Sequence, residues 1–278
     1  MPTTRFAPSP TGYLHLGHAY SALIASRATE GGTFILRIED IDPVRCKPEY
    51  TEAIFEDLNW LGLNWVEPVR LQSQHLADYS EALDKLREKG VVYPCFCTRC
   101  IIDQEAQNSG QAPHADDGTI IYPGTCRCLS KSERELKLAQ QRNVNWRLDV
   151  AAALRLTGPL FWHDRACGKV EATPQIFGDA VLARKDVPTS YHLSVTADDH
   201  LQGVTLVTRG EDLFASTHVH RLLQALLGYE TPEYYHHALM REASGRRYAK
   251  RDKSATLKSL REQGKTPEEI IRNKLGLN

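Results

Sequence analysis

Residues 5–18 read RFAPSPTGYLHLGH and are the most informative stretch of the sequence. Arg5–Ala7 predicts a short strand, and the proline, serine and glycine residues that follow predict a loop. A helix is expected over His18–Glu30, ending at Gly31, and a strand over Phe34–Asp40. This order places the loop at the carboxyl edge of the first strand, where open α/β sheets bind nucleotides.

His15, Gly17 and His18 stand at the expected start of this helix. The amides and the dipole at a helix N-terminus favour phosphate, and a glycine lets the backbone approach a ligand closely. Two histidines can also donate hydrogen bonds to phosphate oxygens in a transition state. These residues therefore favour a phosphate site, although a His-x-x-His spacing taken alone more often marks a surface position or a metal-binding pair.

Strands and helices alternate along the rest of the chain. Pro48–Leu61 and Leu76–Glu88 are expected to be helices, because proline suits a first helical turn and Gly90 suits a helix end. Further strands are predicted over 146–148, 180–184, 191–195 and 204–208. Ser216 is expected to cap a helix that runs to Leu227, and the Thr-Pro-Glu-Glu at 266–269 predicts a capping box at the start of a short terminal helix. The alternation favours an α/β fold with a mostly parallel sheet.

The length and composition are those of an ordinary globular protein. The 278 residues suffice for one large domain or for a catalytic domain with an insertion. Hydrophobic residues make up 41 %, and no apolar run approaches the roughly 20 residues that span a bilayer, so a membrane protein is excluded. No apolar signal segment follows Met1, which predicts a cytoplasmic location. The net charge of −1 means that a polyanion site must arise from local charge.

Such a local charge occurs near the C-terminus. Residues 241–265 contain nine lysines and arginines against three acidic residues. This excess of six positive charges indicates a candidate site for a polyanion, with a solvated basic face as the alternative.

Five of the seven cysteines lie between residues 95 and 128, on either side of a polar stretch without periodicity. We interpret this region as an inserted module. In a reducing compartment such a cluster binds metal more often than it forms disulfides. The spacing alone favours a structural zinc site made of Cys97-x-x-Cys100 and Cys126-x-Cys128, and free thiols without metal are the alternative.

Residues 6–18 together with LRIEDID at 36–42 resemble the ATP-binding opening of class I aminoacyl-tRNA synthetases, specifically the glutamate subgroup. The resemblance implies a Rossmann-like catalytic domain in which His15, Gly17 and His18 bind ATP. It also implies that Arg5 and Ser9 contact the amino acid. A guanidinium suits this role because it pairs bidentately with a carboxylate, which glutamate has and glutamine lacks. Glu39 would face the substrate ammonium.

Two later blocks extend the resemblance. DDHLQGVTLVTRGEDL at 198–213 is similar to the family's catalytic half, which places Tyr191 and Arg209 at amino-acid contact positions. Asp198 and Asp199 within it are expected to be solvated. RYAKR at 247–251 stands where the family has its Lys-Met-Ser-Lys-Ser loop, and Lys250 matches the lysine that stabilises the triphosphate, although the first three letters differ. The implied catalytic residues are His15, His18 and Lys250.

The resemblance changes the predicted zinc ligands. The family's truncated branch has a Cys-x-Cys and a tyrosine ahead of a further cysteine, which match Cys95, Cys97, Tyr122 and Cys126 here. Tyrosine is an uncommon zinc ligand, so Cys100 and Cys128 remain substitutes. One structural Zn²⁺ is expected.

The sequence continues for 27 residues after Arg251, so we expect no C-terminal anticodon-binding domain. The expected organisation is a catalytic domain in two halves (1–90 and 131–240), a zinc module (91–130), and a basic loop with a short helical region (241–278). This organisation resembles the truncated glutamyl-Q tRNA(Asp) synthetase family. Members activate L-glutamate with ATP and Mg²⁺ and transfer it to queuosine in the anticodon loop of tRNA(Asp).

We expect the protein to be a monomer that acts on L-glutamate, ATP and queuosine-containing tRNA(Asp).

Three alternative functions remain open at this point. A minimal glutamyl-tRNA synthetase would charge a tRNA 3′ end. A nucleotidylyltransferase of the same superfamily would share the His-x-Gly-His element but would need no glutamate pocket. A non-enzymatic zinc-containing RNA-binding protein would leave Arg5, His15, His18 and Lys250 without a role.

Overall fold

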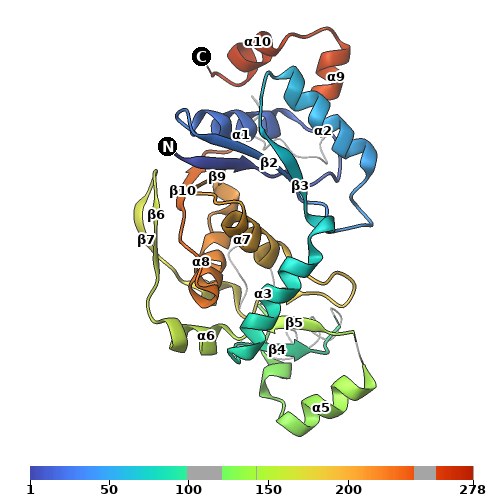
Figure 1. Cartoon of the computed structure of the whole chain (residues 1–278), viewed down its shortest axis with the longest axis vertical. Helices are drawn as coiled ribbons and strands as arrows, with labels where there is room; N and C mark the ends of the chain where they lie inside the picture. Colours follow the sequence, from blue (N-terminus) through green and yellow to red (C-terminus); the bar gives the residue numbers. More distant parts are fainter. Residues whose placement is uncertain (99–120, 142, 241–254, 278) are drawn as a thin grey trace.

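The computed structural model describes residues 1–98, 121–141, 143–240 and 255–277. Its elements are distributed along one long axis, and the chain runs to the far end of this axis and back (Figure 1). The N-terminal sheet and the C-terminal helices lie at one end of this axis, and α5 (Lys131–Gln140) lies at the other.

The first part of the chain is a parallel α/β unit. It contains β1 (Thr3–Phe6), α1 (Leu16–Arg27), β2 (Thr33–Ile38), α2 (Pro48–Trp60) and β3 (Val66–Leu71). β2 lies between β1 and β3 and runs parallel to both. The predicted strand, loop, helix and strand are confirmed.

The second part adds a four-stranded sheet. Its elements are β6 (Phe161–Asp164), β7 (Gly168–Glu171), α7 (Tyr191–Leu201), β9 (Leu206–Gly210), α8 (Ser216–Leu227) and β10 (Glu233–His237). β10 runs parallel to β9 and β6, and β7 is antiparallel at the edge. This sheet meets the first one beside β1, where the Thr205 amide donates to the Thr3 carbonyl at 3.0 Å. The prediction of a mostly parallel sheet is confirmed.

A small antiparallel sheet lies farther along the axis. β5 (Asn145–Leu148) pairs with β4 (Val92–Cys95) on one side and with β8 (Val181–Ala183) on the other. α3 (Leu76–Glu88) leads into this sheet, and α6 (Val150–Thr157) leaves it. Short helical turns connect the remaining elements: η1 (Gln72–Gln74), η2 (Thr125–Cys128), η3 (Pro174–Phe177) and η4 (Glu211–Leu213).

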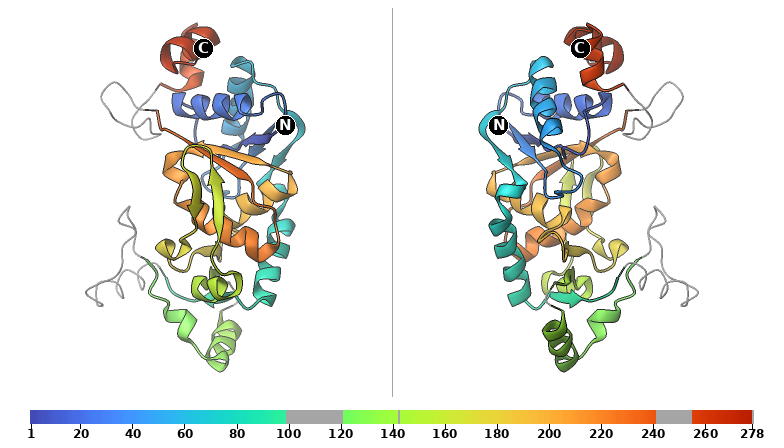
Figure 2. Two further views of the ribbon diagram at one scale, coloured as in Figure 1. Left: turned by 90° about the vertical axis from the view of Figure 1, so that its left-hand side faces the viewer. Right: turned by 90° about the vertical axis from the view of Figure 1, so that its right-hand side faces the viewer.

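The C-terminal helices pack back onto the first unit. They are α9 (Leu257–Glu262), α10 (Pro267–Glu269) and the π-helical turn η5 (Ile270–Lys274), and both views in Figure 2 place them beside α1 and α2. The Leu257 amide donates to the Leu14 carbonyl at 2.8 Å, and Thr256 forms a β-bridge with His15. The predicted capping box of Thr266 and Glu269 is present.

Two large hydrophobic cores support these parts. One contains residues of α1, β2 and α2 together with Leu257, Leu260 and Ile270 from the C-terminal helices. The other joins α3, β5, β8, α7 and α8. None of the helices in the described ranges is long and apolar enough to cross a membrane.

One predicted strand is wrong. The segment Tyr191–Val195 forms the first turns of α7. All residues from Leu193 to Asp199 are buried, so this helix lacks the polar face that reveals a helical period. A smaller difference occurs at α8, where Ser216 is the first helical residue and Ala215 occupies the capping position.

Candidate active site

A cavity of about 580 Å³ opens at the carboxyl ends of the parallel strands. Its lining includes the loop after β1, the start of α1, the residue after β2, the start of α7 and the end of β9. The sequence-predicted residues that line it are Arg5, Ser9, His15, Gly17, His18, Glu39, Tyr191 and Arg209. Lys250 lies outside the described residues. Met240, the last described residue before that segment, also lines the cavity.

The two histidines form an unusual cap at the start of α1. His15 Nδ1 accepts a hydrogen bond from the Gly17 amide at 3.1 Å, and His18 Nδ1 accepts one from the His15 amide at 3.2 Å. Because each Nδ1 is an acceptor, each neutral ring carries its proton on Nε2. This tautomer can donate to an anion at the helix N-terminus, where the dipole already favours negative charge.

Arg209, at the end of β9, is 6 % exposed. Its Nη1 donates to the Tyr191 hydroxyl at 3.3 Å and to His220 Nδ1 at 3.2 Å, and its Nη2 donates to the Thr217 hydroxyl. Within the part of the chain that the structure describes, no carboxylate forms an ion pair with it. A buried guanidinium surrounded by neutral acceptors provides a site for a substrate carboxylate.

A histidine and an aspartate hold the other side of this guanidinium. Arg209 Nε donates to His236 Nε2 at 3.1 Å, and His236 Nδ1 donates to a carboxylate oxygen of Asp164. Burial and the charge of Arg209 together lower the pKa of His236 to about 4, although Asp164 opposes them, so the ring is neutral near pH 7. The Asp164 carboxylate thus fixes the tautomer that accepts from Arg209. Sequence reasoning missed Asp164 and His236, which lie 72 residues apart.

The acidic doublet at the end of α7 is part of the scaffold. Asp198 and Asp199 are 0 % and 8 % exposed, so the expectation that they are solvated is wrong. Asp199 accepts from Arg5 Nε at 3.0 Å and from Arg37 Nη1 at 2.8 Å, and Asp198 accepts from Arg70 Nε at 2.7 Å. Burial raises the pKa of Asp199, but the two guanidinium groups outweigh it and keep that pKa below its usual value. These pairs tie α7 to all three strands of the first sheet.

Arg5 and Glu39, which line the cavity, already form ion pairs with other side chains of the protein. Arg5 Nη1 donates to the Thr208 carbonyl at 3.0 Å, in addition to its pair with Asp199. Glu39 Oε1 accepts from Arg37 Nη2 at 3.3 Å. Burial raises the pKa of Glu39, which Arg37 and Arg5 partly oppose. The carboxylate at this wall is suited to face a substrate ammonium.

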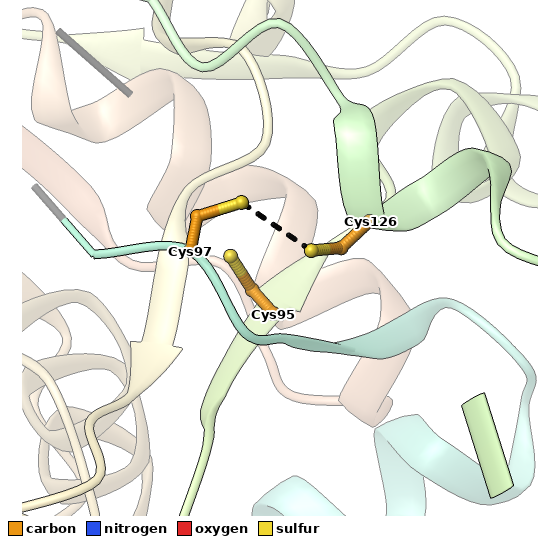
Figure 3. A group of neighbouring side chains, drawn as sticks. All are labelled: Cys95, Cys97 and Cys126. Atoms are coloured by element: carbon orange, nitrogen blue, oxygen red, sulfur yellow. Dashed lines mark hydrogen bonds between the residues drawn. The ribbon is translucent and has the colours of Figure 1, made fainter. Parts of the chain in front are cut away.

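A separate cluster of cysteines lies at the end of β4, at the edge of the small antiparallel sheet. The sulfur atoms of Cys95, Cys97 and Cys126 lie within 4.8 Å of one another and point toward a common centre (Figure 3). The Cys97 sulfur lies 3.4 Å from the Cys126 sulfur and 3.4 Å from the Tyr122 hydroxyl. This cluster could hold a metal ion such as zinc. Cys128 is exposed and is not part of the cluster.

The donor chemistry of this cluster fits a metal. A hydrogen bond with Cys95 lowers the pKa of the Cys126 thiol, and the same hydrogen bond raises the pKa of Cys95. Thiolates are the ligands that zinc prefers in structural sites. The alternative set predicted from spacing needs Cys100, which lies outside the described residues, and the exposed Cys128.

The fold and the cavity are those of a nucleotide-binding catalytic domain that binds an acidic substrate. The family model described as tRNA synthetases class I (E and Q), catalytic domain, matches residues 2–277, and the chain belongs to this family. This membership excludes two of the alternatives that the sequence left open, a nucleotidylyltransferase and a non-enzymatic RNA-binding protein.

The chain is similar over nearly its whole length to proteins named glutamyl-Q tRNA(Asp) synthetase. It is 46 % identical to the one from Rhodobacter capsulatus, covering 97 % of this chain and 98 % of the relative. It is 41 % identical to the one from Nitratidesulfovibrio vulgaris, covering 94 % of this chain and 81 % of the relative. By contrast, it spans only 59 % of glutamate–tRNA ligase 1 from Ruegeria pomeroyi, at 39 % identity.

Solved structures of related enzymes share the fold. A glutamate tRNA ligase from Elizabethkingia meningosepticum, in complex with its amino acid, matches with a TM-score of 0.80 and 28 % identity, covering 98 % of this chain and 59 % of that chain. Methionyl-tRNA synthetase from Mycobacterium tuberculosis shares the fold, with a TM-score of 0.56 and 10 % identity over 98 % of this chain and 63 % of that one.

Proposed function

We propose that the protein activates L-glutamate with ATP as glutamyl-adenylate and transfers the glutamyl group to queuosine in the anticodon loop of tRNA(Asp). The observation that carries the proposal is the nearly complete, end-to-end similarity to glutamyl-Q tRNA(Asp) synthetases. The site supports it, because buried Arg209 forms no ion pair with any carboxylate of the described residues, whereas an acidic side chain of a substrate would neutralise it.

Glutamate and ATP would share the large cavity. Arg209, Tyr191 and Arg5 would bind the side-chain carboxylate, and Ser9 and Glu39 would orient the amino group. This arrangement discriminates against glutamine, because a neutral amide would leave the Arg209 charge buried and unpaired.

The phosphates would lie at the start of α1. His15, Gly17 and His18 offer hydrogen-bond donors there, and bound Mg²⁺ would supply further neutralisation of the triphosphate. We also assign Lys250 to the phosphates. The described residues that flank its segment support this role, since Met240 lines the cavity and Thr256 forms a β-bridge with His15.

The proposed reaction has two steps, activation and transfer, and atoms and charge balance in each. An α-carboxylate oxygen of glutamate attacks the α-phosphorus of ATP, and the bond to pyrophosphate breaks. A hydroxyl of the queuosine cyclopentenediol then attacks the activated carbonyl carbon, AMP leaves, and the hydroxyl proton passes to solvent or to the AMP phosphate. Catalysis rests on positioning and on charge stabilisation.

We assign the cysteine cluster to one structural Zn²⁺, held by Cys95, Cys97, Cys126 and Tyr122. The Tyr122 hydroxyl lies beside the Cys97 sulfur and accepts the Cys126 amide at 2.9 Å, so it occupies the fourth side of the cluster. β4, which ends at Cys95, lies well away along the molecule from β1, which carries Arg5 (Figure 1), and this separation suits a structural role. The protein would act in the cytoplasm, where its tRNA substrate is found, as a monomer.

The test is transfer of labelled glutamate to four preparations of tRNA(Asp). Two carry queuosine and two carry guanosine, and one of each pair lacks the 3′-terminal adenosine. Label on queuosine-containing tRNA, whether or not the terminal adenosine is present, supports the proposal. Label that requires the terminal adenosine and ignores queuosine would make the protein a minimal glutamyl-tRNA synthetase.

A further inference from the structure

Two histidines from neighbouring helices form a hydrogen-bonded chain with Arg209. His220 belongs to α8 and is 3 % exposed, and its Nδ1 lies 3.2 Å from Arg209 Nη1. Its Nε2 lies 3.1 Å from Nδ1 of His192, the second residue of α7. Arg209 lines the cavity and neither histidine does, so the chain leads from the cavity into the packing between α7 and α8.

The positions of the protons along this chain follow from Arg209. A guanidinium only donates, so His220 Nδ1 accepts, and the neutral ring carries its proton on Nε2. His220 Nε2 then donates to His192 Nδ1, so His192 also carries its proton on Nε2. A further proton on either ring would place two donors face to face. The three groups are therefore satisfied together only when both imidazoles are neutral.

The surroundings of the two rings maintain this neutral state. Burial and the charge of Arg209 together lower the pKa of His192 to about 4. Burial, Arg209 and His192 hold the pKa of His220 well below its ordinary value. Near pH 7 the guanidinium is therefore held by imidazole nitrogens that carry no charge.

Neighbouring arginines of the site are held in a different way. Arg5 and Arg37 both pair with the carboxylate of Asp199, at 3.0 and 2.8 Å, so their charges are compensated within the protein. Among the described residues, every acceptor within hydrogen-bond distance of Arg209 is a hydroxyl oxygen or an imidazole nitrogen. These partners fix the orientation of the Arg209 guanidinium but leave its charge uncompensated.

We propose that His220 and His192 are positioning residues that determine specificity for glutamate: as a neutral pair they fix Arg209 Nη1 and leave its charge for the side-chain carboxylate of the substrate. This inference rests on the proposed function. Because neither histidine lines the cavity, both act through Arg209. A carboxylate in the place of His220 would pair with Arg209 and compete with an acidic substrate, whereas a neutral acceptor of similar shape would preserve the site.

Two substitutions of nearly equal size separate charge from shape. The Oδ1 of asparagine or aspartate takes the place of His220 Nδ1, so His220→Asn keeps a neutral acceptor and His220→Asp supplies a charged one. His192→Leu removes the group that accepts His220 Nε2–H. His218→Asn is the matched control, because His218 is a buried histidine of the same helix that does not line the cavity, and its Nδ1 accepts the Thr173 amide at 2.8 Å.

The assay is exchange of pyrophosphate into ATP by the full chain. It gives the KM of L-glutamate, the KM of ATP and the inhibition constant of L-glutamine, and the ratio of this inhibition constant to the glutamate KM measures discrimination. We expect His220→Asp to raise the glutamate KM about 30-fold and to lower the ratio about tenfold, and His192→Leu to raise the glutamate KM about threefold to tenfold. His220→Asn and His218→Asn should stay close to the wild type, and the ATP KM should stay nearly constant throughout.

Equal behaviour of His220→Asp and His220→Asn, whether both keep or both lose the use of glutamate, would overturn the proposal. A rise of the ATP KM as large as that of the glutamate KM would also overturn it, because the histidines would then support the fold in general. If His220→Asp does not fold, an unchanged glutamate KM in His192→Leu overturns the proposal. Absence of glutamate-dependent exchange in the wild type would overturn the proposed function instead, so the two failures are distinguishable.

Discussion

Replacement of Asp164 by asparagine tests how the protein holds Arg209. One carboxylate oxygen of Asp164 accepts the amides of Ala166 and Cys167, at 2.9 and 3.1 Å, and the other accepts His236 Nδ1. In Asp164→Asn the two backbone amides require the amide oxygen at the first position. The NH₂ group must then face His236, which forces the imidazole proton onto Nε2.

With that tautomer, the hydrogen bond between Arg209 Nε and His236 Nε2 is lost, because both atoms carry a proton. His236 Nε2–H would face Arg209 Nε–H across the present 3.1 Å, so Arg209 loses one hydrogen bond and shifts. A hydrogen bond to a charged group is worth about 1.5–3 kcal/mol, which corresponds to a loss of roughly 10- to 150-fold in kcat/KM for glutamate. The KM for ATP should change little, because the phosphates are assigned to the start of α1.

The assay is pyrophosphate exchange with glutamate and ATP varied in turn. Asp149→Asn is the matched control, since Asp149 also accepts a backbone amide, from Ala152 at 2.8 Å, but does not line the 580 Å³ cavity. An unchanged glutamate kcat/KM in Asp164→Asn, or an equal loss in Asp149→Asn, would refute the role of Asp164 and His236 in positioning Arg209.

Three further predictions concern stability and metal binding. Because burial depresses the pKa of His236 to about 4, the unfolded chain takes up a proton at this residue below pH 6.5 that the folded chain does not. His236 therefore contributes about 1.4 kcal/mol per pH unit to the fall of the free energy of unfolding between pH 6.5 and 4, and His236→Gln should reduce the slope of that free energy against pH by this amount, measured by urea denaturation at several pH values. Cys97→Ser should lose bound zinc in a metal analysis of the purified protein, whereas Cys128→Ser should keep it, and equal zinc contents would argue against the assigned ligands. Asp198→Ala should lower the free energy of unfolding in urea by about 3–5 kcal/mol, because it removes the buried carboxylate that accepts hydrogen bonds from Arg70, Gln72 and Tyr79, while Asp84→Ala at an exposed ion pair should cost under about 1 kcal/mol; similar losses would contradict the burial argument.

Short-range sequence patterns were sufficient to predict much of the secondary structure. The helix Leu76–Glu88 was predicted with the bounds that the structure has, because an apolar face and a terminal glycine both act within one helix. Pro48 marked the start of α2 in the same way. The wrong strand at Tyr191–Val195 shows the limit of such signals, since a helix buried on all sides has no polar face and can resemble a buried strand.

The predicted substrate residues do meet at one cavity, but their supporting partners could not be read from sequence. Arg5 pairs with Asp199, 194 residues away, and Arg70 pairs with Asp198, 128 residues away. An acidic doublet before a turn is usually solvated, and only the tertiary fold brings the arginines to it. The resemblance to a known family identified the direct contacts, whereas the scaffold that holds them required the structure.

The C-terminal helices belong to the first hydrophobic core, and this has a consequence for synthesis of the chain. Leu257, Leu260 and Ile270 pack against residues of α1, β2 and α2, which leave the ribosome long before them. The roughly 200 intervening residues take about 10–40 s to translate at 5–20 residues per second. During that interval the N-terminal unit exposes an apolar face that nothing yet covers, which makes this nascent chain a natural client for chaperones that shield hydrophobic surface.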